Sequence, residues 1–152
     1  MTDPAPAMDP ASDTEIRNLV ARFGLACTKH DTPAFRALWA EEGTWRIGEP
    51  FAQEATGPDA CVEMLDRLWQ GNDYFLQFTT QGPIDIDGDE AHSESLCQEF
   101  ARGPERYYRT NGIWTDRLVR RDGRWLFAER SYRCLWLDLS PFSGDVFPLQ
   151  GD

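Results

Sequence analysis

The second half of the sequence is dominated by long segments with β-strand patterning, separated by short turns. These segments run from Tyr74 to Asp87, from Glu90 to Arg102, from Arg106 to Arg120 and from Arg124 to Leu139. Gly88-Asp89 is a turn sequence, and Asp122-Gly123 is typical of a tight hairpin. Strands of about 12 residues or more twist and bend strongly. The sequence therefore predicts a curved antiparallel sheet.

The first half of the chain predicts three helices. Apolar residues at three- and four-residue steps indicate a helix from about Thr14 to Thr28, preceded by capping-box spacing at Ser12. A short second helix begins at Asp31 or Thr32 and is followed by a strand at residues 44–47. Gly57-Pro58 opens the third helix, which ends near Gly71.

This order of elements indicates an α+β fold. A curved antiparallel or mixed sheet forms a cone, with the three N-terminal helices around an apolar pocket. A chain of 152 residues, 41% of them hydrophobic, is large enough to bury one core. We therefore expect one domain at residues 12–139 and a pocket that holds a small hydrophobic molecule.

The two ends of the chain differ from this domain in composition. Residues 1–11 are rich in Pro, Ala and Asp, which predicts a disordered leader, and they have neither the basic residues nor the apolar run of a secretory signal. The tail at 140–152 keeps several apolar side chains, so we expect it to cap the pocket or a dimer face. No run approaches the roughly 20 apolar residues of a membrane helix. By default we expect a cytoplasmic location and no membrane partner.

Charge and composition argue against several classes of partner. The net charge of −11 is unfavourable for binding nucleic acid, which requires clustered Lys and Arg. Four cysteines lie far apart without a C-x-x-C pair, which favours buried thiols over disulfides or zinc. The two histidines lie in no metal-binding pattern. We expect neither a metal nor a cofactor.

Three stretches resemble SnoaL-like proteins of the nuclear transport factor 2-like superfamily. Residues 23–39 are similar to the opening helices, residues 84–91 to a middle β element, and residues 112–130 to the last hairpin. The resemblance extends from Glu15 to Trp136 and implies the same cone-shaped fold. The superfamily includes polyketide cyclases, scytalone dehydratase, steroid isomerases, dehydrochlorinases and binding proteins without catalytic activity. The fold therefore does not name a reaction.

The resemblance also locates a site at which this chain departs from its relatives. Dehydratase-like members carry an Asp three residues before the helix-capping Asp, often after a Tyr, and a His partner on a strand. Those positions hold Thr28, Cys27 and Gln77 here. Thr and Gln do not titrate near neutral pH, but both hydrogen-bond a carbonyl or hydroxyl. A one-residue shift of the alignment instead brings His30 or Asp31 into the role of the base.

Four further candidates for the pocket lie on predicted strands. Trp45 and Trp114 fall at positions that line the cone in relatives, and both also fit an ordinary core. Tyr108 and Asn111 lie on one strand, where the alternation of side chains leaves only one of them facing inward.

The resemblance implies an enzyme that promotes cyclisation, dehydration or isomerisation of a hydrophobic, oxygenated cyclic compound such as a polyketide, a terpenoid or a steroid-like molecule. Thr28 and Gln77 orient the polar group of the compound in this hypothesis, and Asp116 or His30 moves the proton. Asp116 can also pair across the final hairpin with Arg130 as a purely structural element. The alternatives are a binding or accessory protein that keeps the pocket without a base, and a structural dimer module with a filled cone. The resemblance further implies a homo-oligomer, either a dimer or a trimer.

Overall fold

A computed structural model describes residues 9–149 and contains three helices and one six-stranded sheet. The elements, in chain order, are α1 (Pro10–Lys29), α2 (Thr32–Arg36), β1 (Trp39–Ile47), β2 (Gln53–Thr56), α3 (Pro58–Trp69), β3 (Tyr74–Asp87), β4 (Glu90–Gly103), β5 (Arg106–Arg121) and β6 (Arg124–Asp138). The strand order is β2-β1-β6-β5-β4-β3. β1 runs parallel to β6 and every other pairing is antiparallel, so the sheet is mixed. The predicted α+β fold is confirmed.

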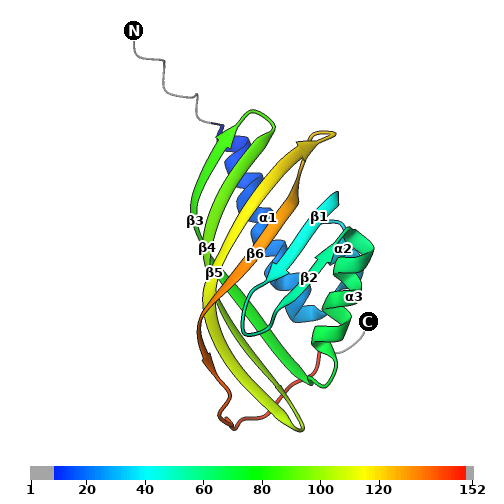
Figure 1. The fold of residues 1–152 in the computed structure, drawn as a ribbon, viewed down its shortest axis with the longest axis vertical. Coiled ribbons are helices and arrows are strands. Elements are labelled where there is room, and N and C mark those ends of the chain that lie inside the picture. Colours follow the sequence, from blue (N-terminus) through cyan, green and yellow to red (C-terminus); the bar gives the residue numbers. More distant parts are fainter. Residues whose placement is uncertain (1–8, 150–152) are drawn as a thin grey trace.

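The sheet curves around the helices (Figure 1). α1 runs along the inner side of the curve, and α2 and α3 lie beside β1 and β2 at one end. The strands β3 to β6 match the four predicted segments closely, and Asp122 and Gly123 both have positive φ at the predicted hairpin turn. Bulges interrupt β3 and β6 and allow such long strands to bend. Within the described residues, no helix is long and apolar enough to cross a membrane.

One of these bulges depends on a glycine. β5 and β6 shift register between Asn111 and Gly112. A Cβ at Gly112 would lie 2.2 Å from the carbonyl oxygen of Arg133 and 2.6 Å from the ring of Tyr132. Only glycine fits this close approach of two strands.

The start of α1 differs from the prediction. The helix begins at Pro10 because the side chain of Asp9 caps it, accepting a hydrogen bond from the Ser12 amide at 3.1 Å. Ser12 is instead buried and bonds to Arg120 at 3.1 Å. Pro10 and Ala11, expected in the leader, are therefore helical, and residues 1–8 of that leader lie outside the described part of the chain.

The region around β1 also shows where sequence patterns were insufficient. α2 has only five residues, and β1 begins at Trp39 rather than Thr44, because pairing with β6 extends it. The edge strand β2 was not predicted, since Gln-Glu-Ala-Thr has no apolar alternation and is held only by its pairing with β1. The third helix starts at Pro58, as predicted from Gly57-Pro58.

The core fills the space between α1 and the inner face of the sheet. α1 contributes the predicted stripe, which includes Ile16, Val20 and Phe23, all buried. The ring of Phe23 packs edge-on against Trp45 and Trp114, with centroids 5.8 and 5.3 Å apart. Cys27, Cys61 and Cys97 are buried and Cys134 is half-buried, all as free thiols.

One residue in the described part of the tail, Phe142, contacts the outer side of the sheet. The ring of Phe142 packs against Tyr107, with centroids 5.5 Å apart, and lies 5.8 Å from the guanidinium carbon of Arg109. Tyr107 and Arg109 alternate along β5 with the inward-facing Tyr108 and Thr110. Residues 140–149 therefore include at least one contact with the outer face, and residues 150–152 lie outside the description.

Candidate functional site

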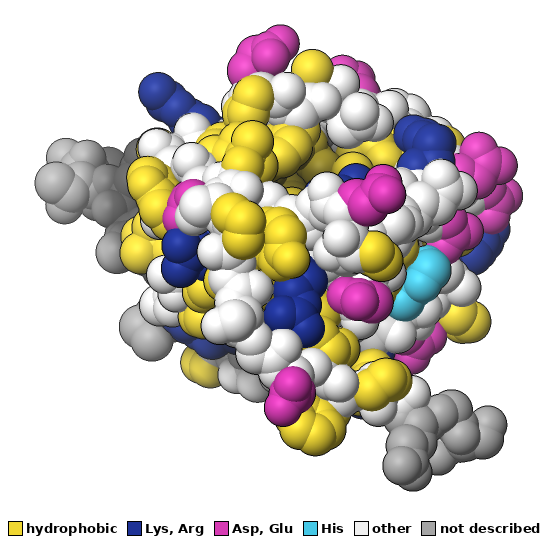
Figure 2. Space-filling model, turned by 90° about the horizontal axis from the view of Figure 1, so that it is seen from below, with side chains coloured by type: hydrophobic (Ala, Val, Ile, Leu, Met, Phe, Trp, Pro, Cys, Tyr) yellow, Lys and Arg dark blue, Asp and Glu magenta, His cyan; other side chains and the backbone are white. Residues whose placement is uncertain are grey.

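A central cavity lies between the inner face of the sheet, the end of α1 and α3. Its volume is about 50 Å³. Seen from below, hydrophobic side chains gather around a hollow at this end of the molecule (Figure 2). The lining residues are Cys27, Trp45, Ile47, Phe51, Leu65, Leu68, Trp69, Phe75, Gln77, Glu99, Tyr108, Trp114 and Tyr132. The cavity is thus mostly apolar and aromatic, with a few polar groups and one carboxyl group.

The structure places the Thr28 side chain against the backbone of Gln77. The Thr28 hydroxyl accepts a hydrogen bond from the Gln77 amide at 3.0 Å and donates one to the Gln77 carbonyl oxygen at 3.4 Å. Thr28 thereby anchors α1 to β3, and its side chain does not line the cavity. The side chain of Gln77 does line the cavity and is directed to a neighbouring strand.

Gln77 binds Glu99, a residue that the sequence reasoning missed. The two residues are cross-strand partners in β3 and β4, and Gln77 Nε2 donates to Glu99 Oε1 at 2.7 Å. The neighbouring Cys97 thiol lies 3.9 Å from the same oxygen. Inward residues of β4 alternate through Ser93, Ser95 and Cys97, so the same alternation, continued by two positions, would have found Glu99.

The environment of Glu99 favours its protonated form. Burial in the apolar cavity raises the pKa of Glu99 from 4.5 to about 7, and the hydrogen bond from Gln77 and the charge of Arg130 oppose this rise. A carboxyl group with a pKa near 7 exists in both protonation states at neutral pH. It can therefore accept and return a proton under physiological conditions.

Two tyrosines line the cavity beside Glu99. Burial raises the pKa of both Tyr108 and Tyr132, so their hydroxyl groups stay protonated at neutral pH. The Tyr132 hydroxyl lies 3.2 Å from Thr110 Oγ1. Because Tyr108 lines the cavity, it faces inward. Asn111 lies on the outer face, as the alternation of side chains along β5 requires. Asn111 does not line the cavity.

Cys27, Trp45 and Trp114 also line the cavity and are at the same time buried core residues. The overlap of core and pocket wall follows from the shape of the cone. The indole groups supply flat apolar surface to the cavity wall. The indole nitrogens of both tryptophans have no hydrogen-bond partner among the described residues.

Asp116 and Arg130 form a fully buried pair across the final hairpin. Arg130 Nη1 lies 3.3 Å from Asp116 Oδ2, which also accepts a hydrogen bond from Ser93 Oγ at 3.2 Å. The guanidinium carbon lies 4.3 Å from the ring centre of Phe23 and 4.4 Å from that of Trp114. Burial raises the pKa of Asp116 to about 6, and the charge of Arg130 opposes the rise. Neither residue of the pair lines the cavity, although Arg130 lies against Trp114, which does.

His30 and Asp31 also lie away from the cavity. His30 occupies the left-handed position that ends α1, stacks on Trp69 and lies 2.7 Å from Asp66 through Nε2. Asp31 caps α2 by accepting a hydrogen bond from the Ala34 amide at 3.1 Å. Both residues have local structural partners, and neither lines the cavity. Within residues 9–149, no group of three or more His, Cys, Asp or Glu residues is arranged to hold a metal ion.

Solved structures share this architecture at low sequence identity. A hexachlorocyclohexane dehydrochlorinase, LinA-type3 from Novosphingobium barchaimii, superimposes with a TM-score of 0.81 at 17% identity, covering 91% of this chain and 97% of that chain. A putative scytalone dehydratase from Novosphingobium aromaticivorans gives 0.77 at 18% identity, covering 88% and 91%. A Mycobacterium tuberculosis protein of unknown function gives 0.71 at 25% identity, covering 84% and 77%. No curated protein matches this chain in sequence.

The family comparison covers most of the chain. The model of the SnoaL-like domain matches residues 10–131, from the first residue of α1 into β6. This range includes every residue that lines the central cavity except Tyr132. The chain therefore belongs to the SnoaL-like family, and the central cavity is its candidate ligand site.

Proposed function

We propose that the protein is an enzyme that moves a proton on a small, hydrophobic, oxygenated cyclic compound, and that Glu99 is its acid and base. The observation that carries this proposal is a carboxyl group with a pKa of about 7 in an aromatic cavity. Perturbed carboxyl groups in such cavities are candidates for catalysis. The reaction is a cyclisation, a dehydration or an isomerisation, all of which need a proton to be taken from one atom and given to another.

The groups around Glu99 support specific roles. Ionised Glu99 removes a proton from a carbon next to the ligand carbonyl, and the electron pair moves to the carbonyl oxygen. The protonated hydroxyl of Tyr108 is available to donate a hydrogen bond to that oxygen. In a compound with a neighbouring carbon–carbon double bond, Glu99 returns the proton to the far end of the resulting dienolate and the carbonyl re-forms, which shifts the double bond. In a compound with a β-hydroxyl group, the electron pair returns from the oxygen to form a carbon–carbon double bond and expels that hydroxyl, which Glu99 protonates to release water. Gln77 holds the Glu99 carboxyl in place through the 2.7 Å hydrogen bond.

The dimensions of the cavity limit the ligand. A volume of about 50 Å³ is well below the roughly 300–1,000 Å³ of typical ligand sites. Binding of a ring compound therefore requires side chains at the rim to move outward. Phe51 precedes the edge strand β2 and is only half-buried, which makes it a suitable side chain for this movement.

A specific observation also favours a second candidate, a ligand-binding protein without catalysis. Thr28 and Gln77 stand where the family resemblance led us to expect an Asp–His base. Among residues 9–149, the hydroxyl of Thr28 bonds only to the backbone of Gln77. In this candidate, Glu99 and Gln77 bind a polar group of the ligand and no proton is transferred.

Proton exchange distinguishes the two candidates. The enzyme is incubated in D₂O at pD 7 with 2-tetralone, a small bicyclic ketone, and loss of the α-proton signal is followed by NMR. The wild type should exchange the proton faster than the buffer does, and Glu99→Gln should reduce the enzymatic rate by about 100-fold or more. Glu94→Gln is the matched control, because Glu94 lies on the same strand but is exposed. Saturable binding of 2-tetralone without exchange would favour the binding protein, and an unchanged rate in Glu99→Gln would refute the role of Glu99.

We further propose that copies of the chain associate through the outer face of the sheet. An outer apolar patch consists of Phe78, Leu96 and Leu135, whose exposed fractions are 47%, 59% and 57%. Exposed apolar surface of this kind is typical of protein interfaces. The association is with a second or third copy of the same chain, which is the dimer or trimer expected from the family resemblance.

A further inference from the structure

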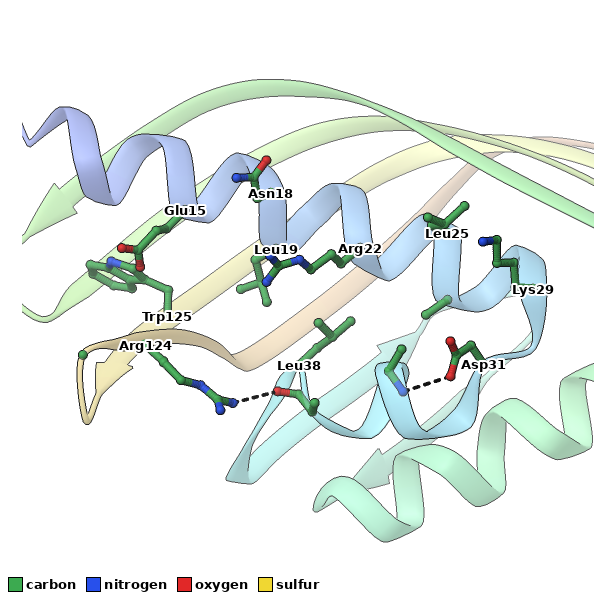
Figure 3. Close-up of a pocket in the computed structure, with 14 residues that line it drawn as sticks. Glu15, Asn18, Leu19, Arg22, Leu25, Lys29, Asp31, Leu38, Arg124 and Trp125 are labelled. Atoms are coloured by element: carbon green, nitrogen blue, oxygen red, sulfur yellow. Dashed lines mark hydrogen bonds between the residues drawn. The ribbon is translucent and has the colours of Figure 1, made fainter. Parts of the chain in front are cut away.

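A second concave site lies along the flank of α1, beside the core. This lateral groove runs between α1, the segment from Asp31 to Leu38, and the turn between β5 and β6 (Figure 3). Its volume is about 620 Å³, which lies within the usual range of ligand sites. The lateral groove and the central cavity share no lining residue. It is therefore a separate site.

A single face of α1 forms one wall of the lateral groove. The lining residues of α1 recur at three- and four-residue steps, which places them in one row along the helix; they are Glu15, Asn18, Leu19, Arg22, Leu25, Ala26 and Lys29. The fourteen residue steps from Glu15 to Lys29 correspond to about 21 Å of helix. The wall is therefore long enough for an extended ligand.

The floor of the lateral groove is apolar. Leu19 and Ala26 of α1 meet Leu38 and Trp125 from the opposite side, and the exposed fraction of each of the four side chains is 4% or less. Leu25 lies higher on the wall and is 54% exposed. A ligand in the groove would bury this leucine, which gains free energy in proportion to the apolar area removed from water.

The cations of the lateral groove lack acidic partners. Arg22 and Lys29 project from α1, and Arg124 reaches across from the hairpin turn, where it donates a weak hydrogen bond to the Ala37 carbonyl oxygen at 3.4 Å (Figure 3). Within residues 9–149, none of the three has a carboxylate within salt-bridge distance, whereas the nearby Arg17 is paired with Asp13. In a chain with a net charge of −11, three unpaired cations around one apolar floor make this groove electrostatically favourable for an anion.

We propose that the lateral groove binds an amphipathic monoanion, a small molecule with an apolar body and one carboxylate or sulfonate group. The anionic group lies between Arg22 and Arg124, and the body lies on the apolar floor. Glu15 and Asp31 stand at the two ends of the groove, and the Asp31 carboxylate is already bonded to the Ala34 amide. Repulsion from both carboxylates keeps the anionic group near the middle.

Binding of sodium octanoate tests this proposal, with 1-octanol as the uncharged probe of the same length. Titrations of the full chain are followed by amide chemical shifts in NMR. Octanoate should bind saturably below 1 mM and shift amides of the lateral groove such as Ala26 and Gly123. Octanol should bind at least about tenfold more weakly, and raising the NaCl concentration should weaken only octanoate.

Charge variants locate the anionic group. Arg22→Gln with Arg124→Gln should weaken octanoate binding by about tenfold, which corresponds to two exposed charge interactions. Glu15→Gln should strengthen it by about twofold. The control is Arg67→Gln with Arg133→Gln, which makes the same change in net charge at two exposed arginines outside both sites. Urea unfolding checks that each variant is folded.

Three results would overturn the proposal. The first is the absence of saturable octanoate binding. The second is chemical-shift changes confined to the central cavity at Gln77 and Glu99. The third is an equal loss of octanoate affinity in the groove variant and the control variant. None of them bears on proton exchange by Glu99, because the two sites share no lining residue.

Discussion

The replacement Glu99→Gln should stabilise the protein at high pH and leave it nearly unchanged at low pH. The pKa of Glu99 is about 7 in the folded protein, against 4.5 for an ordinary glutamate. Between these two values the unfolded chain has released the proton and the folded protein still holds it. The free energy of unfolding therefore falls as the pH rises from 4.5 to 7.

The size of the effect follows from the two pKa values. A difference of about 2.5 pKa units corresponds to roughly 3 kcal/mol. The glutamine side chain of the variant does not ionise, so the variant avoids this loss. The new amide is also able to donate to Gln77 Oε1, which has no partner among the described residues. We expect the free energy of unfolding of the variant to exceed that of the wild type by about 3 kcal/mol at pH 8.5, and by less than about 1 kcal/mol at pH 4.

Urea unfolding at half-unit steps between pH 4 and pH 8.5 measures this difference. Other titrating groups are common to both proteins and cancel in the subtraction. Glu94→Gln on the exposed side of the same strand should change stability by less than about 0.5 kcal/mol at every pH. A difference between Glu99→Gln and the wild type that is constant with pH would refute the raised pKa and, with it, the basis for catalysis by Glu99.

Other variants test the remaining features. Arg130→Met should be more destabilised at pH 8 than at pH 5, by about 1–2 kcal/mol in urea unfolding. The reason is that Asp116 loses the cation that favours its ionised form. Equal destabilisation at both pH values would contradict this pairing. His30→Ala should reduce stability by less than about 1 kcal/mol, and its rate of proton exchange with 2-tetralone should stay within twofold of the wild-type rate. A large loss of rate would indicate that His30 takes part in the reaction. Leu96→Glu should shift the protein to monomers in analytical ultracentrifugation, and an unchanged assembly would exclude this part of the outer face as the interface.

Much of the fold could be predicted from local patterns. The alternation and turn sequences of β3 to β6 placed four strands, because a strand with one buried face carries its own period-two signal. The stripe of α1 and the Pro at the start of α3 likewise indicated two helices. The short strand β2 and the first residues of β1 carried no such signal, because their conformation depends on pairing with neighbouring strands.

The candidate site was predicted less completely than the fold. The family resemblance pointed to Gln77 and Trp114, both of which line the cavity. Alternation along β5 indicated only that Tyr108 or Asn111 faces inward, and the structure decided for Tyr108. Only the tertiary structure decided that Glu99 lies beside Gln77 and that Asp116 is buried with Arg130 away from the cavity. The physical reason is that a pKa and a ligand contact depend on burial and on neighbours distant in sequence, and strand register and curvature set both.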